Sequence, residues 1–111
     1  MKSLNNTLQG VPASPGKAVG NIFILDNDSD VSKMLDGDIV LMFELDMQRF
    51  PLVKAKASGF ILEEASINSH ISTAVREAGK PCIVQAKGIR DILKNGMKVE
   101  LDGATGIISI L

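Results

Sequence analysis

Short apolar runs recur along the chain and predict buried strands. Residues 38–43 are apolar after a leading aspartate, and residues 59–62 are apolar after a leading glycine. Neither run alternates between apolar and polar positions, as a strand with one face in water does. Residues 20–25 and 82–84 are further strands of this kind. The pattern predicts a sheet whose strands are short and largely buried.

The apolar spacing changes to a helical period after residue 70. Apolar residues then recur at i, i+3, i+4 and i+7, at Ile71, Ala74, Val75 and Ala78. Asn68 or Ser69 can cap the start of this helix with a side-chain oxygen, and Gly79 followed by Lys80 and Pro81 ends it. The segment predicts an amphipathic helix that begins beside His70.

The C-terminal part of the chain predicts a hairpin. Residues 97–101 alternate between apolar and polar side chains, and the turn-forming residues 102–106 join them to the apolar run 107–111. Residues 28–35 and 89–93 predict short helices in the connections. With the strands above, we expect about six strands and two to four helices.

Proline, glycine and polar residues mark the irregular segments. Residues 1–9 are mostly polar and predict a flexible leader, and two prolines with three glycines in residues 10–20 predict a shaped loop. Asp46 can cap a helix of residues 47–57, in which Pro51 either causes a kink or marks the first turn.

Length and composition fit one α/β domain, which we place at residues 10–111. The chain has 111 residues, of which 45% are hydrophobic, enough for a core without disulfides or metals. The formal net charge is −1, and the aromatic residues are four Phe without Trp or Tyr, which argues against nucleic-acid binding. No signal peptide or membrane-spanning run is present, so we expect a cytoplasmic protein with no membrane partner. The start at Met1 favours a free-standing protein over a piece of a larger enzyme.

Cysteine and histidine are each represented once, by Cys82 and His70. A single cysteine cannot form an internal disulfide, and its place in an apolar run predicts a buried, unreactive thiol. One histidine and one cysteine among scattered carboxylates give no zinc-ligand spacing, so we expect no metal site.

His70 is the strongest candidate for chemistry, because it lies at an expected helix start. Amide hydrogens and a partial positive charge at that position would hold a phosphoryl group attached to the imidazole. On its own, a histidine at such a position is more often a capping or surface residue. A serine-hydrolase triad of His70 with Ser69 or Ser72 and Glu63 or Glu64 is weaker, because hydroxyls so close in sequence are better explained as helix caps.

Many individually weak matches occur in a fixed order through residues 10–110. They are Ala13, Ser14, Pro15, Gly16, Ala18, Gly20, Gly37 to Leu41, Pro51, Ala55, Ala57, Gly59 to Ile61, Ser69, His70, Arg76, Gly79, Pro81, Val84, Gly96, Val99, Leu101 to Gly103, and Gly106. In this order they resemble the swivelling phosphohistidine domain of phosphoenolpyruvate-utilising enzymes, such as pyruvate phosphate dikinase, phosphoenolpyruvate synthase and enzyme I of the sugar phosphotransferase system.

The resemblance implies a single swivelling β/β/α domain that acts as a phosphoryl carrier. It implies that His70 accepts the phosphoryl group on its outer ring nitrogen, with Ser69 and Asn68 positioning it. No cofactor would bind to the domain itself. Phosphoenolpyruvate, and in some members ATP with Mg, would be bound by phosphoenolpyruvate-binding and nucleotide-binding partner domains or proteins.

The chain departs from the family directly before His70. The family has two glycines and a threonine where this chain has Ala65, Ser66 and Asn68. Glycines allow positive φ, so their replacement can restrict the loop, whereas Asn68 can still donate a hydrogen bond. The alternative function is therefore a non-catalytic regulatory or interaction module that kept the swivelling fold. Arg76, six residues past His70 on the helix, is expected to brace the domain rather than contact a phosphate.

Overall fold

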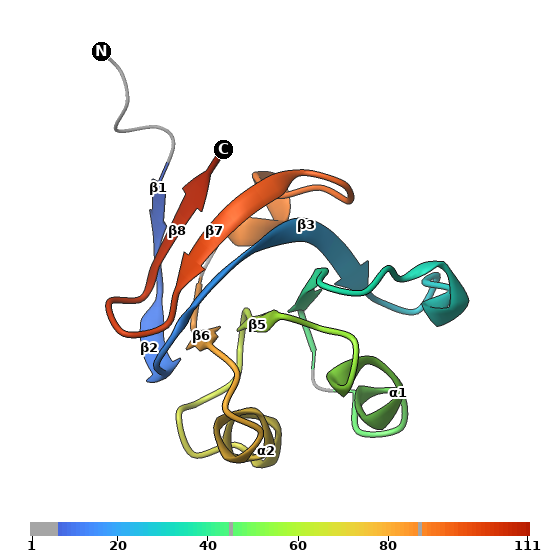
Figure 1. Ribbon diagram of the computed structural model, residues 1–111, viewed down its shortest axis with the longest axis horizontal. Coiled ribbons are helices and arrows are strands. Elements are labelled where there is room, and N and C mark those ends of the chain that lie inside the picture. The colour runs from blue at the N-terminus through green and yellow to red at the C-terminus, as the bar shows by residue number, and fades with distance from the viewer. Residues whose placement is uncertain (1–6, 45, 87) are drawn as a thin grey trace.

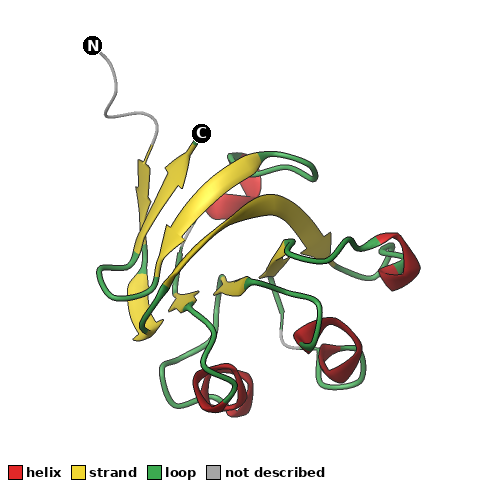
Figure 2. Ribbon diagram, in the orientation of Figure 1, coloured by secondary structure: helices red, strands yellow, loops and turns green. Residues whose placement is uncertain are grey.

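The computed structural model describes residues 7–44, 46–86 and 88–111 as a layered α/β structure (Figures 1 and 2). The strands are β1 (Thr7–Gln9), β2 (Val11–Ser14), β3 (Lys17–Leu25), β4 (Ile39–Met42), β5 (Gly59–Leu62), β6 (Cys82–Val84), β7 (Lys98–Asp102) and β8 (Ile107–Ile110). The helices are α1 (Phe50–Lys54), α2 (His70–Glu77) and the short 3-10 helices η2 (Val31–Lys33) and η3 (Ile89–Asp91). Neighbouring strands are paired in the order β1-β8-β7-β3-β4-β5-β6-β2.

The long strand β3 joins a parallel half of the sheet to an antiparallel half. Residues 17–21 of β3 pair antiparallel with β7, and residues 22–25 pair parallel with β4. The parallel ladder continues from β4 to β5 and from β5 to β6, while β7 pairs antiparallel with β8. Figure 1 shows the β7 and β8 half folding over one side of the β4 to β6 strands, with α1 and α2 on the opposite side. The expected β/β/α arrangement is confirmed.

The middle strands contribute alternate side chains to two separate hydrophobic clusters. Phe60 and Leu62 of β5 belong to the cluster under the helices, whereas Ile61 between them belongs to the cluster under β7 and β8. All three are fully buried. Because successive side chains of a strand point to opposite faces, a strand between two layers needs an apolar residue at every position. This explains the uninterrupted apolar runs.

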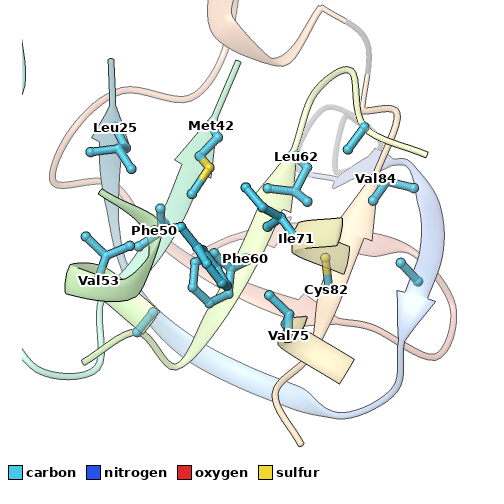
Figure 3. Packing of buried hydrophobic residues seen from close by; sticks show 14 of the residues in the cluster. Leu25, Met42, Phe50, Val53, Phe60, Leu62, Ile71, Val75, Cys82 and Val84 are labelled. Carbon is cyan, nitrogen blue, oxygen red and sulfur yellow. The ribbon is translucent and has the colours of Figure 1, made fainter. Parts of the chain in front are cut away.

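Helix α2 packs against the sheet through the stripe that the sequence predicted. Ile71 and Val75 are buried and lie beside Leu62 and Cys82 in the helix-side cluster (Figure 3). The helix ends at Glu77, and Gly79 follows with a φ of 75°, a left-handed conformation that favours glycine after a helix. The predicted helix is confirmed, and it fixes His70 at its first position.

Two strands occur where we predicted irregular chain. Thr7–Gln9, placed in the flexible leader, pairs with β8, and Val11–Ser14, placed in the shaped loop, pairs with β6. Both are the outermost strands in the pairing order, so Pro12 can be tolerated there although it has no N–H to donate. The predictions for these residues, and of about six strands, were wrong. The remainder of the leader, residues 1–6, lies outside the described residues.

The helix predicted at residues 47–57 is shorter and starts later. Helix α1 begins at Phe50 and has Pro51 in its first turn, so the proline marks the true start. Asp46 instead caps the preceding turn, where its carboxylate accepts hydrogen bonds from the backbone N and the side-chain Nε of Arg49. These bonds and the Arg49 charge hold the pKa of Asp46 below its usual value, chiefly through the backbone bond.

Candidate phosphohistidine site

The candidate site lies where the chain leaves β5 and enters α2. The parallel strand ends at Leu62, residues 63–69 form the connecting loop, and His70 is the first residue of the helix. The His70 side chain is exposed. Carboxyl ends of parallel strands and helix N-termini are where open α/β sheets present ligands, and the helix start favours negative charge. His70 is therefore accessible to a reactant and lies in a field that suits a phosphoryl group.

Ser69 is the N-cap residue of α2. Its side-chain oxygen accepts a hydrogen bond of 3.1 Å from the backbone N of Ser72. Ser69 has an extended backbone, and its carbonyl accepts the backbone N–H of Thr73. The sequence left Asn68 and Ser69 as alternative caps, and the structure selects Ser69.

Ser72 joins the helix to the loop from inside the protein. It is fully buried, and its Oγ donates a 2.7 Å hydrogen bond to the carbonyl of Ser66. The Oγ atoms of Ser69 and Ser72 are 2.6 Å apart, and the backbone N of Ser69 also donates to the Ser66 carbonyl. These three serines fix the last turn of the loop. From the sequence we weighed Ser72 as a triad member and explained it better as a local cap, although a serine on the buried face of an amphipathic helix signals that its hydroxyl needs a partner.

Arg76 holds the same loop from the other end of the helix. Its Nη2 donates a 2.9 Å hydrogen bond to the carbonyl of Ile67, and its Nε donates a 3.0 Å bond to the carbonyl of Ala13 in β2. Arg76 therefore links α2, the loop and an outer strand. The expectation that Arg76 braces the domain is confirmed.

The loop does not need glycine at residues 65 and 66. Among the described residues other than glycine, only Gln85 has a positive φ, so Ala65 and Ser66 both adopt ordinary backbone conformations. The Ala65 side chain is buried in the helix-side cluster, and Ser66 is exposed. This loop therefore holds Ala65 and Ser66 without a left-handed backbone, and the expectation that they restrict its docking stays a prediction.

Asn68 lies in the turn before the cap and is exposed. Within residues 7–44, 46–86 and 88–111, no hydrogen bond is found that joins its side chain, or that of Ser69, to the His70 imidazole. Ser69 is thus placed as a cap of the helix that carries His70. A role for Asn68 in positioning His70 stays a prediction.

An ion pair that we did not predict from the sequence holds the first residue of the loop, Glu63. Glu63 is only 7% exposed, and its Oε1 is 2.6 Å from Nη2 of Arg90. The Arg90 guanidinium also lies over the ring of Phe43, 4.4 Å from its centroid. Hydrogen bonding to Glu63 is the main cause that raises the pKa of Arg90. Because Glu63 is committed to Arg90, it does not serve a triad with His70. Residues so far apart along the chain offer no local pattern from which to predict the pair.

A cleft opens beside this ion pair, at the carboxyl ends of β5 and β6. Its walls are Glu63, Glu64, Gln85, Gly88, Arg90 and Asp91. Gln85 has a φ of 56°, although left-handed conformations are unfavourable for residues with a Cβ. Its backbone N donates to the carbonyl of Leu62, so the β5–β6 pairing holds this conformation in place. Sequence reasoning did not identify Gln85 as special.

Cys82 lies in the middle layer and takes no part in the site. Burial raises the pKa of its thiol to about 12, so the unreactive neutral form is favoured, as predicted. In the part of the chain that the structure describes, no group of three or more His, Cys, Asp or Glu side chains is placed to hold a metal ion. None of the described helices is long and apolar enough to cross a membrane.

Comparisons with known proteins agree with this geometry. The model of the family "PEP-utilising enzyme, mobile domain" matches residues 34–106. The phosphoenolpyruvate synthase of Pyrococcus furiosus is 33% identical over 101 residues, which are 91% of this chain and 12% of that protein. The chain thus spans only about an eighth of the length of this curated relative.

Solved structures share the fold at lower identity. Aconitase X from Thermococcus kodakaraensis has a TM-score of 0.67 at 20% identity, covering 95% of this chain and 98% of that one. An Enzyme I structure has a TM-score of 0.64 at 22% identity, covering 74% of this chain and 34% of that one. The fold, the position of His70 and the extent of the family match lead to one assignment. The chain belongs to the family of mobile domains of phosphoenolpyruvate-utilising enzymes.

Proposed function

We propose that the domain is a phosphoryl carrier and that His70 is the residue phosphorylated. The observation that carries this proposal is an exposed histidine, the only one in the chain, at the first position of a helix whose preceding loop is fixed by Ser72 and Arg76. When a nucleophile at a helix start accepts a phosphoryl group, the negative charge of that group lies at the positive end of the helix dipole. Family membership supports the same chemistry.

The transfer would use one lone pair of the imidazole. The outer nitrogen, Nε2, forms an N–P bond while the bond from phosphorus to the donor oxygen breaks, and the donor leaves with that electron pair. The reverse exchange with an acceptor oxygen or water regenerates the free imidazole. Because the phosphoryl group must be brought to the donor and then to the acceptor, the domain would move between two sites.

Phosphoenolpyruvate is the donor class that the family and the similarity to phosphoenolpyruvate synthase support. We assign its binding to a partner domain or protein, and likewise any ATP and Mg, because the chain spans a small part of its relatives. In this proposal the domain itself binds no cofactor. Asn68, in the turn before His70, would position the phosphoryl group, and Ser69 would hold the helix start.

Intact-mass measurement tests the carrier role. The chain is incubated with phosphoenolpyruvate and an extract of its source cells, in parallel with His70→Ala. We expect one acid-labile phosphoryl group on the parent chain and none on the variant. Because the chain has a single histidine, a phosphohistidine signal in ³¹P NMR would identify the position without ambiguity. Acid-labile phosphate that persists on His70→Ala would contradict the proposal.

A second candidate is an interaction or regulatory module that kept the fold without phosphotransfer. The similarity to aconitase X favours this second candidate, because that protein shares the fold and is not named for phosphoryl transfer. A chain that is never labelled, by extract or by purified phosphoenolpyruvate-utilising partners, would support this candidate over the carrier.

A further inference from the structure

The three serines around the start of α2 have a hydrogen-bond direction that geometry alone fixes. Ser72 Oγ is 2.7 Å from the carbonyl oxygen of Ser66, and a carbonyl can only accept, so the hydroxyl proton of Ser72 is used there. A hydroxyl has one proton. In the 2.6 Å contact between the Oγ atoms of Ser69 and Ser72, Ser69 must therefore be the donor.

With this direction, the single hydroxyl proton of Ser69 is already used in a hydrogen bond to Ser72. The Ser69 hydroxyl oxygen accepts the backbone N–H of Ser72. Only one lone pair remains for any other group. A phosphoryl group offers acceptor oxygens and no donor at neutral pH, so Ser69 has no proton left to give it.

We propose that Ser72 is a positioning residue of the phosphohistidine site. It accepts the hydrogen bond that the Ser69 hydroxyl donates, and this bond holds Ser69 as a helix cap and not as a phosphoryl ligand. The proposal rests on the carrier role of His70 only for its functional consequence. The burial of Ser72 supports it, because a hydroxyl without access to water depends on its protein partners.

The consequence is that Ser69, Ser72 and the Ser66 carbonyl act as one unit. Loss of the Ser69 hydroxyl removes the helix cap and the Ser69–Ser72 bond, and loss of the Ser72 hydroxyl removes the Ser69–Ser72 bond and the bond to the Ser66 carbonyl. In both cases His70, which lies between Ser69 and Ser72 in the chain, loses the Ser69–Ser72 bond that spans it. Removing the second hydroxyl adds little to the loss of the first.

NMR of the hydroxyl protons tests the direction of the chain without any phosphotransfer. In the parent chain we expect slowly exchanging hydroxyl protons from both Ser69 and Ser72. Ser72→Ala should remove both signals, since Ser69 loses its acceptor. Ser69→Ala should remove only its own, because Ser72 still donates to Ser66. Loss of the Ser72 signal in Ser69→Ala would reverse the direction and overturn the proposal.

Labelling of His70 with phosphoramidate, a small donor that needs no partner protein, tests the consequence. Imidazole Nε2 forms the new N–P bond as the P–N bond of the reagent breaks and ammonia leaves. We expect Ser69→Ala, Ser72→Ala and the double variant to be labelled about fivefold more slowly than the parent, as the loss of one net hydrogen bond implies. Thr73→Ala, a hydroxyl deletion in the same helix, is the matched control.

The other outcomes separate the possible failures. Faster labelling of Ser72→Ala than of the parent would mean that the Ser69–Ser72 bond hinders the reaction and does not position His70, which overturns the proposal. Changed stability with unchanged labelling would reduce Ser72 to a purely structural residue, which also overturns it. If the parent is labelled by phosphoramidate but never by phosphoenolpyruvate with a partner, the proposed carrier function is contradicted. The proposal for Ser72 is then still supported by the phosphoramidate result.

Discussion

The guanidinium of Arg76 donates from Nη2 to the carbonyl oxygen of Ile67, 2.9 Å away, and so ties the last turn of α2 to the loop before it. The same side chain donates from Nε to Ala13 in β2. A planar fork of donors can satisfy two carbonyls at once, which a lysine ammonium does less well. The loop that carries the candidate site therefore has its shape set partly by a residue at the far end of the helix.

Replacing Arg76 should loosen this loop. We expect Arg76→Ala to lower the free energy of unfolding by about 1 kcal/mol, since the charged hydrogen bonds are partly exposed, and to speed amide exchange in residues 66–69. Arg76→Lys should recover only part of the loss. Urea unfolding and hydrogen exchange measure these effects. Glu77→Ala, the next residue on the helix, is the control, and an equal change there would contradict the bracing role.

Restoring the family's glycines should not stabilise the loop. Ala65→Gly removes a buried methyl group and adds chain entropy to the unfolded state, which together cost about 1–2 kcal/mol. Ser66→Gly, at an exposed position, should cost only the entropic part, about 0.5–1 kcal/mol. Urea denaturation of both variants checks the difference. A stabilised Ala65→Gly chain would show that Ala65 strains the loop after all.

Gln85 should be replaceable by glycine with a gain in stability. Its φ of 56° is unfavourable for a residue with a Cβ, whereas glycine adopts it readily. We expect Gln85→Gly to raise the free energy of unfolding by about 0.5–1 kcal/mol. Gln85→Ala keeps the same backbone strain and should be nearly neutral. If both variants behave alike in thermal unfolding, the left-handed backbone carries no cost.

The thiol of Cys82 should make stability fall in alkaline solution. Burial raises its pKa from 9.0 to about 12 in the folded chain, so the folded state keeps a proton that the unfolded state has lost. The contribution of the protonated Cys82 thiol to the free energy of unfolding is complete below pH 9 and is lost as the pH rises toward 12. We expect the parent chain to lose up to about 1.4 kcal/mol per pH unit more than Cys82→Ala in this range.

Denaturant titrations of both chains at several pH values between 8 and 11 measure that difference. Groups other than the thiol titrate in both chains, so subtracting one curve from the other isolates Cys82. Parallel curves would mean that the thiol ionises equally in the folded and unfolded states. Below pH 8 the two chains should differ by a constant amount, which reports only the lost packing of the side chain.

The order and type of most elements could be predicted from the sequence because they depend on local periodicity. The apolar run at β5, the helical stripe from Ile71 and the hairpin at the C-terminus all match the structure. Strands β1 and β2 were missed, because their residues become strands only by pairing with β8 and β6, which are distant in sequence. The polar and proline-rich character of those residues concealed this.

The sequence by itself determined the middle layer of the fold, the helix that begins at His70 and the identity of the candidate nucleophile. It did so because burial on two faces leaves an uninterrupted apolar run, a helical period leaves an apolar stripe, and the chain has a single histidine, at the expected helix start. Only the tertiary structure decided how the site is held. The Glu63–Arg90 pair, the Arg76 bond to β2 and the direction of the Ser69–Ser72 bond depend on distances between atoms. Hydrogen bonds and ion pairs are directional and short-ranged, so no pattern in the sequence specifies them until the chain has folded.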